Sequence, residues 1–133
     1  MNLENKEIVI KYRLERANES LNAAKLMYEN NMFVSAMNRI YYSMFYAVHA
    51  LLVLNNVSFS KHGQVKGYFN KEFIKTSRFP KQFGRIYNIV FEYRQKYDYI
   101  DLSIPEKTLI SDYLIEAKKF IDEISEYISI NLS

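Results

Sequence analysis

The segment MFVSAMNRIYYSMFYAVHALLVL, residues 32–54, carries apolar side chains on nearly every side of the helix that it predicts. One stripe at helical spacing consists of Phe33, Met37, Ile40, Met44, Val48 and Leu51, and a second consists of Tyr42, Phe45 and Leu52. A helix that is apolar all round lies at the centre of a bundle or packs on two partners at once. We therefore expect this helix to be central, and another subunit is one candidate for its second partner.

Amphipathic helices are predicted on both sides of this segment. Residues 4–29 form the first, and the break at Asn30 and Asn31 makes it an antiparallel neighbour of the central helix. Further helices are expected over residues 64–75, 81–97 and 105–128, the last with Pro105 at its first position and Ser103 as its cap. The sequence thus predicts an all-α fold, an up-and-down helical bundle of four long helices plus one short helix, in one domain over residues 1–133.

Composition narrows the class of protein. Apolar residues make up 49% of the 133 positions, which is typical of a globular chain. Cysteine is absent, which excludes disulfides, zinc–thiolate sites and cysteine nucleophiles and fits a reducing compartment, so we expect a cytoplasmic protein. No apolar run is long enough for a membrane span, and the first residues lack the pattern of a signal peptide. The net charge of +3 is compatible with RNA or nucleotide binding.

The segment YRQKYDY, residues 93–99, places a charged residue on an apolar stripe. Arg94 continues the line of Phe83, Tyr87 and Val90, and Asp98 follows one turn later. One interpretation is a salt bridge that fixes the end of the helix. The other is an arginine that binds phosphate in a cleft, positioned by Asp98, because a charge on a dry apolar face would be costly.

The polar loop after the central helix contains the second candidate pair, Lys61 and His62. They are either exposed loop residues or ligands for an anion at the start of the short helix. His49 is expected to be a core histidine with a hydrogen-bond partner. There is no glycine-rich phosphate loop, and neither histidine lies near a carboxylate at metal-ligand spacing, so no metal and no cofactor are expected.

Four segments together resemble the HEPN-domain family, in its branch of small stand-alone bundles. AMNRIYYSMFYAVHALL (36–52) is similar to the family's second helix, and SKHGQVKGYF (60–69) to a Lys-His loop that opens a short helix. YRQKYDY resembles the arginine followed by Asp-Tyr at the end of the next long helix, and EAKKFIDEISEYI (116–128) resembles the closing helix. The resemblance covers essentially the whole chain, in order.

The resemblance implies a homodimer. Many HEPN proteins are metal-independent ribonucleases of toxin–antitoxin or defence systems, and others accompany small nucleotidyltransferases that act as antitoxins or partners. Active members carry an arginine, then four to six intervening residues and then a histidine, and the motifs of two subunits share one cleft. In this chain Tyr99 occupies the first of those positions and no histidine follows Arg94 there. The remaining catalytic candidates besides Arg94 are Asp98 and Tyr99, which are poor bases beside an arginine.

These observations lead to one prediction with two alternatives. We expect a homodimeric nucleotide- or RNA-binding component of a toxin–antitoxin or defence module, with a nucleotidyltransferase-like partner and no membrane association. Its binding residues would be Arg94, Tyr99, Lys61 and His62. The alternatives are a metal-independent endoribonuclease toxin, against which the missing histidine argues, and a non-catalytic structural adaptor for a partner enzyme.

Overall fold

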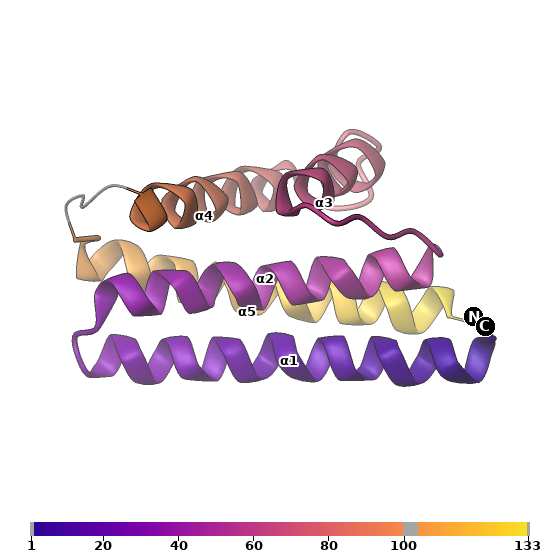
Figure 1. The fold of residues 1–133 in the computed structure, drawn as a ribbon, viewed down its shortest axis with the longest axis horizontal. Coiled ribbons are helices and arrows are strands. Elements are labelled where there is room, and N and C mark those ends of the chain that lie inside the picture. Colours follow the sequence, from indigo (N-terminus) through magenta and orange to yellow (C-terminus); the bar gives the residue numbers. More distant parts are fainter. Residues whose placement is uncertain (1, 100–103, 133) are drawn as a thin grey trace.

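The computed structural model describes residues 2–99 and 104–132, with side chains described for residues 2–95 and 104–132. Its helices are α1 (Leu3–Glu29), α2 (Phe33–Leu54), α3 (His62–Phe69), a π-helical segment (Asn70–Ile74), α4 (Lys81–Tyr99) and α5 (Lys107–Asn131). The described ranges contain no strand; they hold four long helices, one short helix and the π-helical segment (Figure 1). The predicted all-α bundle is confirmed.

The helices form three tiers. In Figure 1, α1 lies along one side of α2 and runs antiparallel to it, while α3 and α4 lie along the other side. Helix α5 lies behind α2 in this view, and the two chain ends meet at one end of the bundle. The surface of α2 opposite α5 is therefore bordered by α1 on one side and by α3 and α4 on the other. None of the described helices is long and apolar enough to cross a membrane.

Helix α2 is the centre of the core. It contacts α1, α3, α4 and α5, and Met37, Ile40, Met44 and Leu51 of its predicted stripe are at most 1% exposed. Burying a side chain of this size stabilises the fold by roughly 1.5–3 kcal/mol. Val34 is the one large hydrophobic residue within α2 that is exposed, so helices of the same chain already cover most of the apolar surface that suggested a second subunit.

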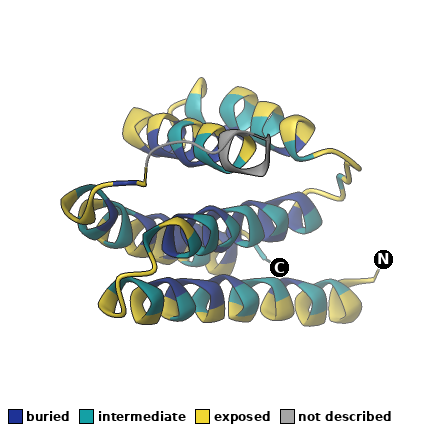
Figure 2. Cartoon of the chain, turned by 60° about the vertical axis from the view of Figure 1, so that its left-hand side comes forward, coloured by how far each residue is buried: buried dark blue, intermediate teal, exposed yellow. Residues whose placement is uncertain are grey.

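Solvent-facing and buried residues separate cleanly on the outer helix α1. Figure 2 shows a buried band on the side of α1 that faces the rest of the bundle and an exposed band on its outer side. Ala17, Leu21 and Ala24 form that buried side, as their spacing predicts. The break that follows is also where it was expected: Asn31 has a φ of 61°, a left-handed conformation that asparagine tolerates better than most residues.

Two helix starts differ from the prediction. The short helix begins at His62, two residues early, so that His62 is held in a helix and not in a loop. Helix α5 begins at Lys107 and not at Pro105, which is buried just before it. Extended backbone at Glu106 (φ −69°, ψ 144°) precedes the helix, and the Glu106 carbonyl accepts from the N–H of Ile110 at 3.2 Å. Ser103, the predicted cap, lies outside the described residues.

Candidate nucleic-acid interface

Arg94 is held by two consecutive tyrosines of α2. Its Nε donates to the Tyr42 hydroxyl at 3.2 Å, and its Cζ lies 5.4 Å and 5.5 Å from the ring centroids of Tyr41 and Tyr42. The three preceding residues on the same line of α4, Phe83, Tyr87 and Val90, are all buried. The side chain thus leaves the core at the point where the guanidinium meets two aromatic rings, a geometry that stabilises a cation.

His62 belongs to the same cluster. Its Nδ1 lies 2.7 Å from the hydroxyl oxygen of Tyr41, and its ring stacks on Phe45 with centroids 4.3 Å apart and planes 7° apart. Tyr41 is fully buried, so it links the imidazole and the guanidinium through a rigid ring. The position of His62 at the start of α3 is secured by the preceding residue, since the N–H of Lys61 donates to the side-chain oxygen of Gln64 at 3.2 Å.

The electrostatics of the cluster favour a neutral imidazole. Burial lowers the pKa of His62, and the positive charge of Arg94 lowers it further. Burial likewise raises the pKa of Tyr41, which keeps that phenol protonated. At neutral pH the cluster therefore combines one fixed cation with a neutral histidine and a neutral phenol.

A pocket of about 300 Å³ opens beside Arg94. Its lining residues are Met27, Val34, Ser35, Met37, Asn38, Arg39 and Arg94. Arg39 is oriented by Asn38, whose Oδ1 accepts from Nη2 at 2.9 Å, and its Cζ lies 4.8 Å from the ring centroid of Tyr42. The Tyr42 ring therefore has a guanidinium from α2 and another from α4 against it, both at the pocket.

The same surface continues along α2 towards its C-terminal end. Arg16 of α1 donates from Nη2 to the Tyr46 hydroxyl at 3.4 Å, with its Cζ 5.3 Å from that ring centroid. Farther along, Nε of Arg13 and Nδ1 of His49 are buried without a hydrogen-bond partner. The pKa of His49 is lowered by burial and then by Arg13. His49 was expected to be a core histidine with a hydrogen-bond partner, and for its Nδ1 this expectation was wrong.

We call this surface the arginine–aromatic face. It consists of Arg13, Arg16, Arg39, Tyr42, Phe45, Tyr46, His49, His62 and Arg94. These side chains are partly buried and come from α1, α2, α3 and α4.

The structure brings together two of the predicted site residues, Arg94 and His62. Lys61 is exposed beside His62. Asp98 and Tyr99 lie in the last turn of α4, and their side chains are outside the described residues, so both roles stay predictions. Tyr41, Phe45 and Arg16 were not predicted as site residues, although the Tyr-Tyr pair was part of the family resemblance. Within the described ranges, no group of three His, Cys, Asp or Glu side chains could hold a metal ion.

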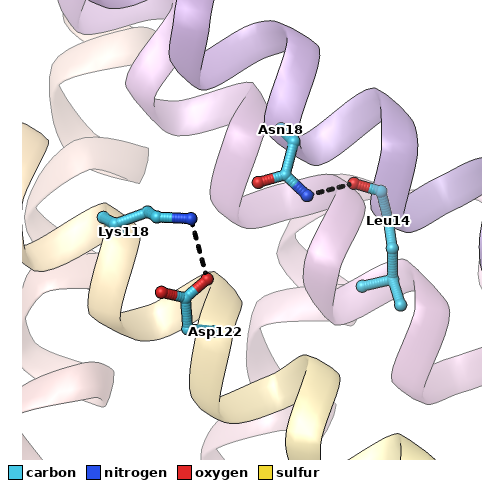
Figure 3. Close-up of polar contacts among 4 residues, drawn as sticks. All are labelled: Leu14, Asn18, Lys118 and Asp122. Atoms are coloured by element: carbon cyan, nitrogen blue, oxygen red, sulfur yellow. Dashed lines mark hydrogen bonds and ion pairs between the residues drawn. The ribbon is translucent and has the colours of Figure 1, made fainter.

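A second groove lies between α1 and α5, with a volume of about 420 Å³. Two of the lysines that line it are paired with acids: Lys118 Nζ lies 3.0 Å from Asp122 Oδ1 (Figure 3), and Lys119 Nζ lies 3.8 Å from Glu116 Oε1. On the opposite wall, Asn18 donates to a backbone carbonyl of its own helix (Figure 3). Acids offset Lys118 and Lys119, whereas two arginines line the pocket beside Arg94, so the arginine–aromatic face is the better candidate for an anionic ligand.

Comparison with known proteins supplies the remaining evidence. The family model of the HEPN domain matches residues 10–127. A UPF0332 protein of Thermotoga maritima is 44% identical over 123 residues, which cover 92% of this chain and 93% of that protein. Two proteins of Methanocaldococcus jannaschii, named "Putative toxin MJ0142" and "Putative toxin MJ0605", are 36% and 32% identical. Those matches cover 86% and 85% of this chain, and 78% and 84% of the respective relatives.

Proposed function

This chain belongs to the HEPN domain family, and we propose that it is the RNA-binding, toxin-side component of a toxin–antitoxin module. The names of the two Methanocaldococcus jannaschii relatives support the toxin side of this proposal. The arginine–aromatic face supports RNA as the ligand, because guanidinium groups beside aromatic rings suit phosphates and bases together.

The placement of Arg94 is the observation that carries the proposal. The side chain sits at the end of a buried line on α4, yet its guanidinium borders a pocket together with Arg39. Its hydrogen bond to Tyr42 is made with a neutral hydroxyl. This bond orients the guanidinium beside the pocket, which suits an arginine that meets a phosphate.

We further propose a homodimer in which α2 and α4 of each subunit face the other copy. Such an arrangement would place two arginine–aromatic faces on opposite walls of one cleft, as the family resemblance implies. The partly buried aromatic side chains of α2 support this arrangement, since tyrosines are common at interfaces. The resemblance also supports a nucleotidyltransferase-like protein as the antitoxin or partner.

Titration of a fluorescent eight-nucleotide RNA tests the proposal. We expect wild-type protein to bind, and Arg94→Ala to lose about 1–3 kcal/mol of binding free energy, the scale of a charge-assisted contact. Lys118→Ala is the matched control, because it removes one positive charge from the α1–α5 side (Figure 3). Equal affinity of Arg94→Ala and wild type would remove Arg94 from the binding site and favour the structural adaptor.

A second candidate function, metal-independent RNA cleavage, is favoured by the position of His62. The imidazole could accept the proton of a 2′-hydroxyl while Arg94 stabilises the charge on the phosphorane. In this alternative, His62 would supply from another helix the histidine that the sequence lacks after Arg94. Incubation of labelled RNA with EDTA tests this: cleavage by wild type that His62→Gln abolishes would support it. Intact RNA in the presence of bound wild-type protein would contradict it.

A further inference from the structure

We propose that the arginine–aromatic face binds a single RNA strand of about four nucleotides that lies along α2, and not an isolated nucleotide in the pocket beside Arg94. The inference rests on the proposed RNA binding and specifies its ligand.

The order of side chains along α2 carries the inference. Arg39 comes first, Tyr42 with Arg94 of α4 follows, and Phe45 with His62 of α3 comes next. The face ends with two pairs between α2 and α1. These are Tyr46 with Arg16, which are hydrogen-bonded, and His49 with Arg13, which lowers the pKa of that histidine. Cationic and aromatic groups therefore recur together at every turn of the helix, as a groove for single strands requires.

The length of the face sets the length of the strand. Arg39 and His49 are ten residues apart on α2, which at the rise of an α-helix is about 15 Å. At about 3.4 Å per nucleotide in a stacked strand, this distance sets an upper limit of about four nucleotides, because a strand with unstacked bases is longer per nucleotide. One nucleotide would fill only the pocket at the Arg39 end.

The chemistry of the face favours a single strand over a duplex. Tyr42, Phe45 and Tyr46 can offer ring surface or edges only to bases that are not already stacked in a duplex. Arg39 and Arg16 lie 4.8 Å and 5.3 Å from the ring centroids of Tyr42 and Tyr46. Their planar guanidinium groups are thereby held at the surface, where they can stack on bases or bind phosphates.

Two unsatisfied atoms mark the far end of the strand. Nε of Arg13 is a buried donor without a partner and Nδ1 of His49 is a buried ring nitrogen without one. Such groups are rare in folded proteins because each costs free energy. Because both atoms are buried, a strand that ends here would contact the exposed parts of the partly buried Arg13 and His49 side chains and not these two atoms themselves.

Calorimetric titration with 5′-phosphorylated, 2′-fluoro oligouridylates of one, two, four and eight nucleotides tests this arrangement. The fluorine removes the 2′-nucleophile, so cleavage cannot disturb the measurement. We expect affinity to rise up to about four nucleotides and then to level off. Arg16→Ala should weaken binding of the tetranucleotide by about tenfold, the effect of one charge-assisted contact, and leave the mononucleotide unchanged.

Control variants keep the result interpretable. Arg16→Lys, which keeps the charge, should retain most of the affinity for the tetranucleotide, and Lys118→Ala should match wild type. Circular dichroism of Arg16→Ala confirms that the variant is folded. Equal affinity for one and four nucleotides, tighter binding of an RNA duplex, or no effect of Arg16→Ala would each overturn the strand while leaving RNA or nucleotide binding intact. Absence of binding at every length would refute the proposed function as well.

Discussion

At the scale of single residues, Tyr42 is the side chain on which the candidate site depends. Its hydroxyl accepts from Arg94 at 3.2 Å, and its ring has Arg39 and Arg94 at 4.8 Å and 5.5 Å from the centroid. The ring and the hydroxyl make different contributions. The ring attracts the guanidinium groups of Arg39 and Arg94, whereas the hydroxyl fixes the orientation of Arg94. Substitutions can separate the two contributions.

Removal of the hydroxyl alone should loosen Arg94. We expect Tyr42→Phe to weaken RNA binding by about 0.5–1.5 kcal/mol, the net contribution of one hydrogen bond, because the ring and its cation contacts remain. Fluorescence titration measures this change. Tyr68→Phe, which removes the acceptor of Asn55 Nδ2 at 3.0 Å, is the control and should bind like wild type. A Tyr42→Phe variant with unchanged affinity would show that this hydrogen bond does not position the guanidinium for RNA.

His62 should make stability depend on pH. The pKa of His62 is lowered in the folded state by burial and by Arg94. As the pH falls through about 6.5, the ordinary pKa of histidine, the unfolded chain therefore binds more protons than the folded chain. The stabilising contribution is therefore complete above that value and is lost as the pH falls towards the lower pKa of the folded state. Urea unfolding at pH 7.5 and pH 5 should show a smaller loss of stability for His62→Gln than for wild type. An identical loss in the two proteins would contradict the role of His62 in this pH dependence. The variant His49→Gln measures the contribution of the other histidine, whose pKa is also lowered.

At the scale of elements, the junction between the π-helical segment and α4 depends on a glycine. A Cβ at Gly84 would lie 2.8 Å from Oδ1 of Asn70 and 3.1 Å from Cγ1 of Ile74. The close approach lets α4 pack on the π-helical segment, which carries the buried Phe73. This packing places the start of α4, and through it the line of residues that ends at Arg94.

Two glycine substitutions, for which we expect opposite effects on stability, test this packing. Gly84→Ala should destabilise the fold by about 1–3 kcal/mol, because neighbouring atoms must move to admit the methyl group. Gly67→Ala, inside α3 with nothing within 4 Å of the added Cβ, should instead stabilise by up to about 1 kcal/mol through helix propensity. Thermal unfolding followed by circular dichroism measures both. The same sign of effect for the two variants would contradict the proposed role of Gly84.

Element by element, the sequence predicted more of the fold than of the site. Helical spacing alone gave the buried stripes of α1, α2 and α5, because the period of a helix is local. Arg94 was found because it interrupts such a stripe. The contact between His62 and Tyr41 could not be predicted, since it depends on the path of the chain from α2 to α3. Pro105 was misplaced because its fixed φ suits an extended residue before a helix as well as the first helical residue.

At the scale of the whole molecule, the proposed dimer accounts for the partial exposure of Tyr42, Phe45 and Tyr46 on α2. The apolar surface of α2 is mostly covered within one chain, so a dimer would be held by a partly polar surface of tyrosines and arginines. Tyrosine and arginine are both enriched at protein–protein interfaces. The association should therefore weaken with salt more than one held by an apolar core.

Light scattering should report a dimer at micromolar concentration. Tyr46→Glu should shift the equilibrium towards monomer, because it places a carboxylate and a smaller side chain at the centre of the face. Ile115→Glu, at a position of α5 that is 56% exposed on the other side of the bundle, is the control and should stay dimeric. A monomeric wild type, or equal effects of the two variants, would contradict the dimer through α2 and α4.

The central claim is that the Arg94 guanidinium meets an RNA phosphate. The most direct measurement is a nitrogen–proton NMR spectrum of the arginine Nε groups during titration with 2′-fluoro RNA, with the Arg94 signal assigned from its absence in Arg94→Lys. The account predicts a saturable shift of the Arg94 signal, while Arg78, bonded to Tyr127 at 3.1 Å at the other end of the bundle, stays in place. RNA binding that leaves the Arg94 signal unmoved would contradict the claim.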